Sequence, residues 1–282
     1  HEARKDARMA ENEAVVRLRD VHKAFGGRVV LDGVNLDIRT GRTTVIIGPS
    51  GCGKSVLLKH IIGLLKPDRG RVFFHDLEVS AMPERRLAEV RRRMGFLFQA
   101  GALFDSMTVE QNIAFPLEEH GLASPDERRR RPDEALSLVG LSGLQDMYPE
   151  KLSGGQRKRV ALARAIVLGP EVILYDEPTT GLDPIRADLI NELILKLGET
   201  LGTTTVVVTH DMTSARKIAH RVLMLHGGRF IADTTPGKLD SVDNEIVARF
   251  VQGVASDEEL AELRAEALLG NHANGANTEA AL

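Results

Sequence analysis

The sequence predicts an α/β fold in which a buried sheet of parallel strands is covered by helices. Three apolar runs, residues 43–47, 172–175 and 204–209, indicate parallel strands that are covered on both faces. Apolar residues at helical spacing follow or separate these runs, which predicts the covering helices. At 282 residues, the chain is long enough for one large domain with a sizeable buried core.

The first elements predicted are three short strands, at residues 15–18, 29–31 and 34–38. Two turn signals separate them, Gly-Gly at 26–27 and Asp-Gly at 32–33. The buried strand at 43–47 then leads into a glycine-rich loop. Beyond this loop, residues 55–65 have apolar side chains at helical spacing, which predicts a helix that ends before a Lys-Pro pair.

The middle of the chain, residues 100–170, carries most of the helical and charged character and predicts a helical region. A further helix is expected between the strands 172–175 and 204–209, which makes a β-α-β crossover of normal length. Its predicted apolar face consists of Ile185, Leu189, Ile190, Leu193, Ile194 and Leu197. Near the end, Gly-Gly at 227–228 predicts a hairpin turn between strands 222–225 and 229–232.

The two ends of the chain have a different composition. Residues 1–14 are polar and charged, so we expect a flexible N-terminus that is not a secretory signal. A short helix is expected at 256–269, followed by a disordered polar tail at 270–282. The expected organisation is a core of residues 15–99 and 171–250, a helical region of 100–170 and a C-terminal extension of 251–282.

Composition excludes several classes of protein. The net charge of −3 lacks the basic excess of nucleic-acid-binding proteins, so no nucleic-acid partner is expected. No stretch approaches the roughly 18 consecutive apolar residues of a membrane-spanning helix. The single cysteine, Cys52, excludes intrachain disulfides and fits a reducing compartment. These observations predict a soluble cytoplasmic protein, so that any membrane-spanning partner would be a separate polypeptide.

A phosphate-binding loop is predicted directly after the strand 43–47. Residues 48–55, Gly-Pro-Ser-Gly-Cys-Gly-Lys-Ser, fit the pattern G-x-x-x-x-G-K-[ST]. Glycines let backbone N–H groups point inward around a polyphosphate, and the following helix offers its positive end to the same phosphates. Lys54 is expected to neutralise the β- and γ-phosphates and Ser55 to ligate Mg²⁺. The predicted ATP-binding residues are Gly48, Pro49, Ser50, Gly51, Cys52, Gly53, Lys54, Ser55 and Val56.

Two acids and a histidine follow the later buried strands. Asp176 and Glu177 come at the carboxyl end of the strand 172–175, the edge of a parallel sheet where ligands bind. Asp176 is placed to hold Mg²⁺, directly or through water, and Glu177 to orient or deprotonate the attacking water. His210 ends the strand 204–209 at the same edge, where it can bond the γ-phosphate or hold Glu177. By position alone, an ordinary structural role for this histidine is equally open.

A second phosphate-binding device is predicted at residues 152–156, Leu-Ser-Gly-Gly-Gln, before a helix expected at 157–167. Ser153 is a good helix N-cap, and the two glycines leave bare N–H groups at a positive helix end. Together with the phosphate loop and the strand that ends in Asp176 and Glu177, this segment resembles the ABC ATPase family over residues 15–250. The resemblance implies an α/β fold with a P-loop NTPase (RecA-like) core, which has a mixed sheet, binds ATP with Mg²⁺ and hydrolyses the ATP. It also implies an antiparallel β subdomain and an inserted helical subdomain.

The resemblance also implies roles for individual residues. Phe25 resembles the aromatic residue that stacks on adenine, and Gln99 resembles the glutamine that contacts Mg²⁺ and water and senses a transmembrane partner. Asp183 lies in a segment that resembles the loop between two nucleotide sites, and His210 resembles the switch histidine. The family pattern further implies a homodimer in which ATP lies between the phosphate loop of one chain and five residues of the other: Leu152, Ser153, Gly154, Gly155 and Gln156.

Two segments indicate a branch of this family. Residues 98–117 and 248–255 resemble the ATPases of Mce-type lipid-transport systems, the Mla group of phospholipid transporters. This similarity implies an integral-membrane permease, an Mce-domain substrate-binding protein and a small STAS-domain partner. It also implies a peripheral position on the cytoplasmic face of the inner membrane, reached through the permease.

Two alternatives stay open beside the lipid assignment. One is the ATPase of an importer of amino acids or another small polar solute, which would have the same core. The other is a soluble, non-transport ABC ATPase. The chain has one cassette and no long coiled-coil insertion, and both features disfavour this second alternative.

Overall fold

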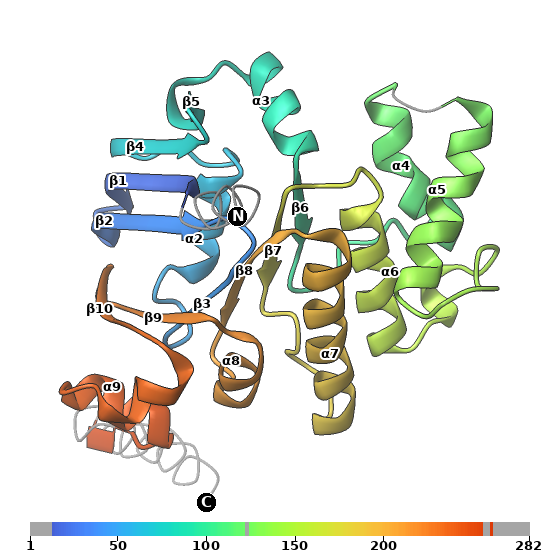
Figure 1. The fold of residues 1–282 in the computed structure, drawn as a ribbon. Helices are drawn as coiled ribbons and strands as arrows, with labels where there is room; N and C mark the ends of the chain where they lie inside the picture. The colour runs from blue at the N-terminus through green and yellow to red at the C-terminus, as the bar shows by residue number, and fades with distance from the viewer. Residues whose placement is uncertain (1–12, 122–123, 256–259, 262–282) are drawn as a thin grey trace, which may run out of the picture. The chain divides into compact units, whose positions relative to one another are not determined.

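A computed structural model describes residues 13–121, 124–255 and 260–261 of the chain. They belong to two compact units, His1–Lys238 and Leu239–Leu282, and each unit is described by itself. The predictions made for residues 1–12, 256–259 and 262–282 lie outside the described residues. Figure 1 shows the order of the helices and strands along the chain.

A six-stranded sheet forms the centre of the first unit, with the strand order β10-β9-β3-β8-β7-β6 (Figure 1). Neighbouring strands run parallel from β9 to β6, and β10 is antiparallel to β9, so the predicted mixed sheet is confirmed. Every residue of β3, β7 and β8 is buried. The strands are β3 (Thr43–Ile47), β6 (Met94–Leu97), β7 (Val172–Asp176), β8 (Thr204–Thr209), β9 (Arg221–His226) and β10 (Arg229–Thr234).

An antiparallel four-stranded sheet has the order β2-β1-β4-β5. It contains β1 (Ala14–Phe25), β2 (Arg28–Arg39), β4 (Arg69–Phe74) and β5 (Leu77–Glu78). The predicted turn at residues 26–27 is confirmed, but the one at 32–33 is wrong because β2 runs through it. The register between β1 and β2 shifts here, and Gly33 has a φ of +71°. The Asp-Gly pair therefore marks a β-bulge rather than a chain reversal.

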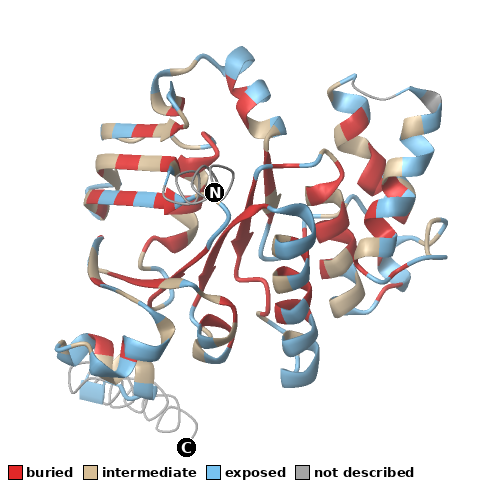
Figure 2. Cartoon of the chain, in the orientation of Figure 1, coloured by how far each residue is buried: buried red, intermediate tan, exposed pale blue. Residues whose placement is uncertain are grey.

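Helix α2 (Lys54–Ile61) packs its apolar side against both sheets. Leu57, Leu58 and Ile61 are fully buried and belong to a core that includes residues of the antiparallel and of the central sheet. Figure 2 shows this core as the red segments along the central strands. The packing places the N-terminus of α2 beside the carboxyl ends of β3 and β7, where the predicted site residues lie.

Helix α7 (Pro184–Leu201) corrects part of a predicted apolar face. Ile190, Leu193, Ile194 and Leu197 are buried, whereas Ile185 and Leu189 are 76% and 60% exposed. At about 100° per residue, Ile185 and Leu189 lie about 90° or more around the helix from the centre of the buried stripe. The apolar face predicted for this helix was therefore too wide. Helix α8 (Met212–Ile218) contacts α7.

Three helices of residues 100–170 begin with the same capping motif. They are α4 (Val109–Glu119), α5 (Pro125–Leu138) and α6 (Gly154–Ile166). Their N-caps are Thr108, Ser124 and Ser153. The hydroxyl of each N-cap accepts a hydrogen bond from the backbone N–H three residues on, and the side chain of that later residue accepts one from the backbone N–H of the N-cap. These helices pack on one another.

The remaining helices are short. Helix α3 (Glu84–Arg92) precedes β6 and was not predicted from the sequence. The 3-10 helices are η1 (Val79–Ala81), η2 (Pro149–Lys151) and η3 (Pro236–Ser241). In the second unit, α9 (Glu245–Gln252) is capped by Asn244 and ends at Gly253, which has a left-handed backbone. Among the described residues, no helix has the length and apolar character needed to cross a membrane.

Candidate active site

The loop of residues 48–53 joins the buried end of β3 to the first turn of α2. Gly53 occupies the N-cap with φ +106°, and no side chain caps the helix there. A Cβ at Gly48 would lie 2.3 Å from the carbonyl oxygen of Leu225, so only glycine fits at this position. The helix therefore presents uncapped backbone N–H groups, which favour an anion at this end.

Lys54 lies folded over the loop that precedes it. Its Nζ donates to the carbonyl oxygens of Gly48 at 2.8 Å and Pro49 at 3.0 Å, and lies 3.5 Å from Oε1 of Glu177. The side chain is 5% exposed. Because the Lys54 ammonium already lies beside the loop, only a short movement would bring it to the oxygens of a phosphate bound there.

Ser55 and Asp176 bring two oxygen donors together. The Ser55 hydroxyl donates to Oδ1 of Asp176 at 2.7 Å, across the gap between α2 and β7. Burial raises the pKa of Asp176, and the Ser55 hydrogen bond acts in the opposite direction. Mg²⁺ prefers hard oxygen ligands and keeps several waters, so this hydroxyl–carboxylate pair fits a Mg²⁺ that also binds phosphate. The described residues contain no cluster of three or more His, Cys, Asp or Glu for a metal held by protein alone.

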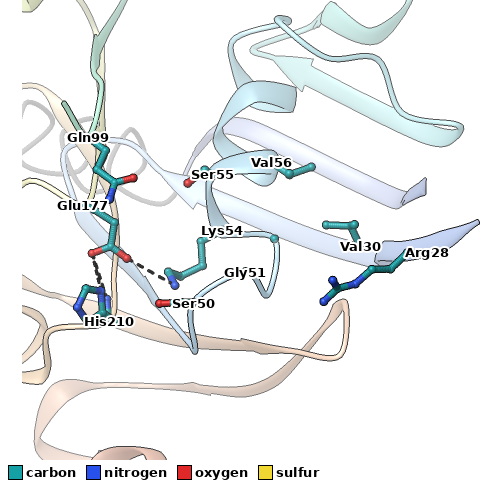
Figure 3. A pocket seen from close by; sticks show the side chains of 11 residues that line it. Arg28, Val30, Ser50, Gly51, Lys54, Ser55, Val56, Gln99, Glu177 and His210 are labelled. Atoms are coloured by element: carbon teal, nitrogen blue, oxygen red, sulfur yellow. Dashed lines mark hydrogen bonds and ion pairs between the residues drawn. The ribbon is translucent and has the colours of Figure 1, made fainter. Parts of the chain in front are cut away.

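Glu177 is constrained in both its backbone and its side chain. Its φ of +48° lies in the left-handed region, which costs a non-glycine residue about 1–2 kcal/mol. Oε2 lies 2.9 Å from Nδ1 of His210 and accepts hydrogen bonds from the hydroxyls of Thr180 at 3.2 Å and Thr209 at 3.3 Å. Figure 3 shows the carboxylate between His210 and Lys54. A buried carboxylate that is held between His210 and Lys54 is suited to accept a proton at a fixed position.

Several of these residues line a cavity of about 350 Å³. It brings together Gln99, Glu177 and His210 with part of the predicted loop (Figure 3). The full lining is Arg28, Val30, Ser50, Gly51, Gly53, Lys54, Ser55, Val56, Gln99, Glu177 and His210. Gly48, Pro49 and Asp176 contact lining residues through the Lys54 and Ser55 hydrogen bonds. Cys52 is half-buried, and burial raises the pKa of its thiol, so it is protonated at neutral pH.

Sequence reasoning missed several residues of this site. Arg28 and Val30 lie on β2, opposite the loop in Figure 3, and the β-sheet pairing of the antiparallel subdomain brings them there. Thr209 is the last residue of β8, and only its position beside His210 in the sequence could have indicated that it belongs to the site. Phe25 lies at the end of β1, is 47% exposed and has the Lys23 ammonium 5.3 Å above its ring, but it is not among the residues that line the cavity.

The segment after Gln99 is held by side-chain hydrogen bonds to its backbone carbonyl oxygens. Asn112 is fully buried and donates to the carbonyl oxygens of Phe104 at 3.0 Å and Met107 at 3.1 Å. Arg164 on α6 donates to the carbonyl oxygens of residues 101 and 102 at 2.9 Å. The segment that carries Gln99 is therefore held by both α4 and α6.

The residues of the 152–156 segment are not part of the lining of the loop cavity of the same chain. Ser153 caps α6, and its hydroxyl accepts from the backbone N–H of Gln156 at 3.3 Å, but none of the five residues lines the cavity. Asp183 caps α7 and accepts from the backbone N–H of Arg186 at 3.0 Å. A second cavity of about 340 Å³ lies beside this loop and shares His210 with the first.

Known proteins resemble this chain in sequence and in fold. A family model described as ABC transporter matches residues 31–180. The intermembrane phospholipid transport system ATP-binding protein MlaF of Haemophilus influenzae is 39% identical over 86% of this chain and 92% of its own length. The probable ribonucleotide transport ATP-binding protein mkl of Mycobacterium leprae is 37% identical over 96% of this chain and 81% of its own.

Solved structures share the fold. One is a dimeric, post-hydrolysis state of the ATP-binding cassette MJ0796 bound to ADP and Pi. It has a TM-score of 0.72 and 37% identity, and covers 78% of this chain and 98% of that chain. Another is cbiO1 from Clostridium perfringens, part of the ABC transporter complex cbiONQ. It has a TM-score of 0.75 and 31% identity, and covers 82% of this chain and 92% of that chain.

Proposed function

The chain belongs to the ABC transporter family of ATP-hydrolysing proteins, and we propose that it drives phospholipid transport through a separate membrane permease. The observation that carries the lipid assignment is the similarity to MlaF, which extends over most of both chains. MlaF is an ATP-binding protein of an intermembrane phospholipid transport system, and this supports a partnership of the chain with membrane components.

In the proposed reaction, Glu177 accepts a proton from water as the water oxygen attacks the γ-phosphorus of ATP. The bond between that phosphorus and the oxygen that bridges to the β-phosphate breaks, and ADP and phosphate leave. His210 holds the Glu177 carboxylate in position. This role is supported by the 2.9 Å distance between His210 Nδ1 and Glu177 Oε2. Lys54 binds the β- and γ-phosphates, and Phe25 stacks on the adenine.

Mg²⁺ supplies charge neutralisation of the phosphates when it is bound. Ser55, Asp176 and Gln99 are the residues proposed to hold it. The support for this set is the 2.7 Å Ser55–Asp176 pair and the position of Gln99 on the wall of the same cavity.

Two copies of the chain complete the site in this proposal. Ser153, Gly154 and Gly155 of one copy bind the γ-phosphate held by the phosphate loop of the other, with Leu152 and Gln156 supporting the turn. This arrangement is supported by the absence of residues 152–156 from the cavity lining of their own chain, and by the dimeric state of the similar cassette MJ0796. Asp183 lies between the two sites.

The proposed partners follow from the MlaF similarity. They are an integral-membrane permease, an Mce-domain substrate-binding protein and a small STAS-domain protein, with the ATPase on the cytoplasmic face of the inner membrane. Ribonucleotide transport is the second candidate, because the mkl protein matches 96% of this chain.

Affinity purification from native membranes tests the lipid assignment. We expect the tagged chain to recover a permease together with an Mce-domain protein, and lipid extraction of that complex to yield bound phospholipid. An untagged strain is the control. Recovery of a periplasmic solute-binding protein instead, or of a complex that transports ribonucleotides in proteoliposomes, would contradict phospholipid transport.

A further inference from the structure

Lys158 is a buried cation to which the reaction above gives no role. It lies on α6, is 8% exposed, and donates from Nζ to the carbonyl oxygens of Pro178 at 2.8 Å and Glu177 at 3.3 Å. Burial lowers the pKa of Lys158, and the charge of Glu177 raises it. Burial of a charged group costs free energy that an apolar side chain would not cost. The presence of a lysine here therefore indicates that its hydrogen bonds to the two backbone carbonyls have a role.

The backbone that Lys158 holds is the strained one. Glu177 has φ +48°, and its own N–H donates to the carbonyl oxygen of Val208 at 2.9 Å. The Glu177 residue is therefore held from both sides, by β8 through its N–H and by α6 through its carbonyl. A left-handed conformation persists only where its surroundings fix it, so loss of the Lys158 hydrogen bonds removes one of the contacts that keep the Glu177 backbone, and with it the carboxylate, in place.

Lys158 also stands close to the start of α6. It is two residues beyond Gln156, in the first turns of a helix that begins at the Ser153 cap. A displacement of this helix end is transmitted to Nζ because a capped helix moves as a rigid element. The end of α6 that would meet ATP of the other chain is thus linked by one side chain to Glu177 of its own chain.

We propose that Lys158 is a positioning residue that couples the 152–156 segment of a chain to Glu177 of that same chain. The inference rests on the proposed two-chain function and adds a route by which ATP bound at one site orients the base of the other. Lys158 acts on the turnover step rather than on the binding of ATP, since it does not line the cavity.

Substitution of Lys158 tests this in steady-state ATPase assays. Lys158→Met keeps the length and removes the donor, and we expect kcat to fall on the order of 10- to 100-fold, as for a base displaced by about 1 Å. KM and the affinity for a fluorescent ATP analogue should stay within about twofold of the wild type, which also shows that the variant is folded. Lys158→Gln retains a donor and should recover part of kcat. A Lys158→Met chain with wild-type kcat would overturn the proposal, and so would Lys158→Gln with no gain over Lys158→Met.

Mixed dimers decide which site Lys158 serves. With Lys158→Met on one chain and Glu177→Gln on the other, the surviving base lacks its lysine, and we expect the same loss of turnover. With both substitutions on one chain, the surviving base keeps its lysine, and the rate should match a dimer that carries Glu177→Gln alone. The reverse pattern would show that Lys158 supports the neighbouring site and would contradict positioning within the chain. Failure of the proposed function has a different signature, because Glu177→Gln on both chains would then still hydrolyse ATP.

Discussion

At the scale of single residues, the site depends on side chains that share partners. Glu177 contacts His210 through Oε2 and lies near Lys54 through Oε1, while its backbone is held by Lys158. Ser55 donates a hydrogen bond to Asp176, the residue that precedes Glu177 in the chain. Because these groups are linked, removal of one changes the orientation of the next. Measured effects of single substitutions at the site should therefore not be additive.

A charged cluster away from the site gives a pH-dependent prediction. Glu171 accepts from Arg93 Nη2 at 3.0 Å and lies 2.9 Å from His75 Nε2. The Arg93 hydrogen bond, followed by that of His75, lowers the pKa of Glu171 below its ordinary 4.5. A carboxylate whose pKa is lowered in the folded state stabilises the fold above its unfolded-state pKa. This contribution is lost as the pH falls through the folded-state value.

We expect Glu171→Gln to lower the free energy of unfolding at pH 7 by roughly 0.2–1 kcal/mol, because the pair is partly exposed. The difference from the wild type should shrink once the pH is below 4.5. Denaturant unfolding at several pH values measures it, with Glu199→Gln on the exposed side of α7 as a control for the lost charge. A difference that grows as the pH falls would contradict the assigned ion pairs.

At the scale of helices and strands, close packing of β6 on α6 connects the Gln99 segment to the 152–156 helix. A Cβ at Gly95, in β6, would lie 2.5 Å from the carbonyl oxygen of Ala165, and a backbone atom cannot move aside cheaply. Gly198 lies inside α7, and a Cβ there would meet only the Thr205 hydroxyl at an ordinary 3.8 Å. Packing therefore requires glycine at position 95, whereas nothing around position 198 excludes a Cβ.

We predict opposite effects on stability for these two glycines. Gly95→Ala should destabilise the fold by about 1–3 kcal/mol through overpacking. Gly198→Ala should stabilise it by about 0.4–1 kcal/mol, since alanine loses less backbone entropy in a helix. Denaturant unfolding of both variants measures the difference. Equal effects of the two substitutions would show that the β6–α6 contact is looser than described.

At the scale of the whole molecule, what could be predicted from the sequence was mostly what is contiguous along the chain. The phosphate loop, the strand ending in Asp176 and the Ser153 cap are runs of neighbouring residues with a local physical reason. Arg28 and Lys158 could not be predicted, because only sheet pairing and helix packing bring them to the site. The bulge at Gly33 was misread as a turn, since both need a positive φ.

The two-chain site is the central claim, and the Glu177→Gln variant tests it most directly. Light scattering with size-exclusion chromatography in ATP and Mg²⁺, beside an ATPase assay, compares this variant with the wild type and with Glu199→Gln. We predict that Glu177→Gln accumulates as an ATP-bound dimer and loses at least about 10²-fold of its turnover, because the proton acceptor is gone while the binding groups remain. A Glu177→Gln chain that stays monomeric with ATP and hydrolyses it at the wild-type rate would contradict the account.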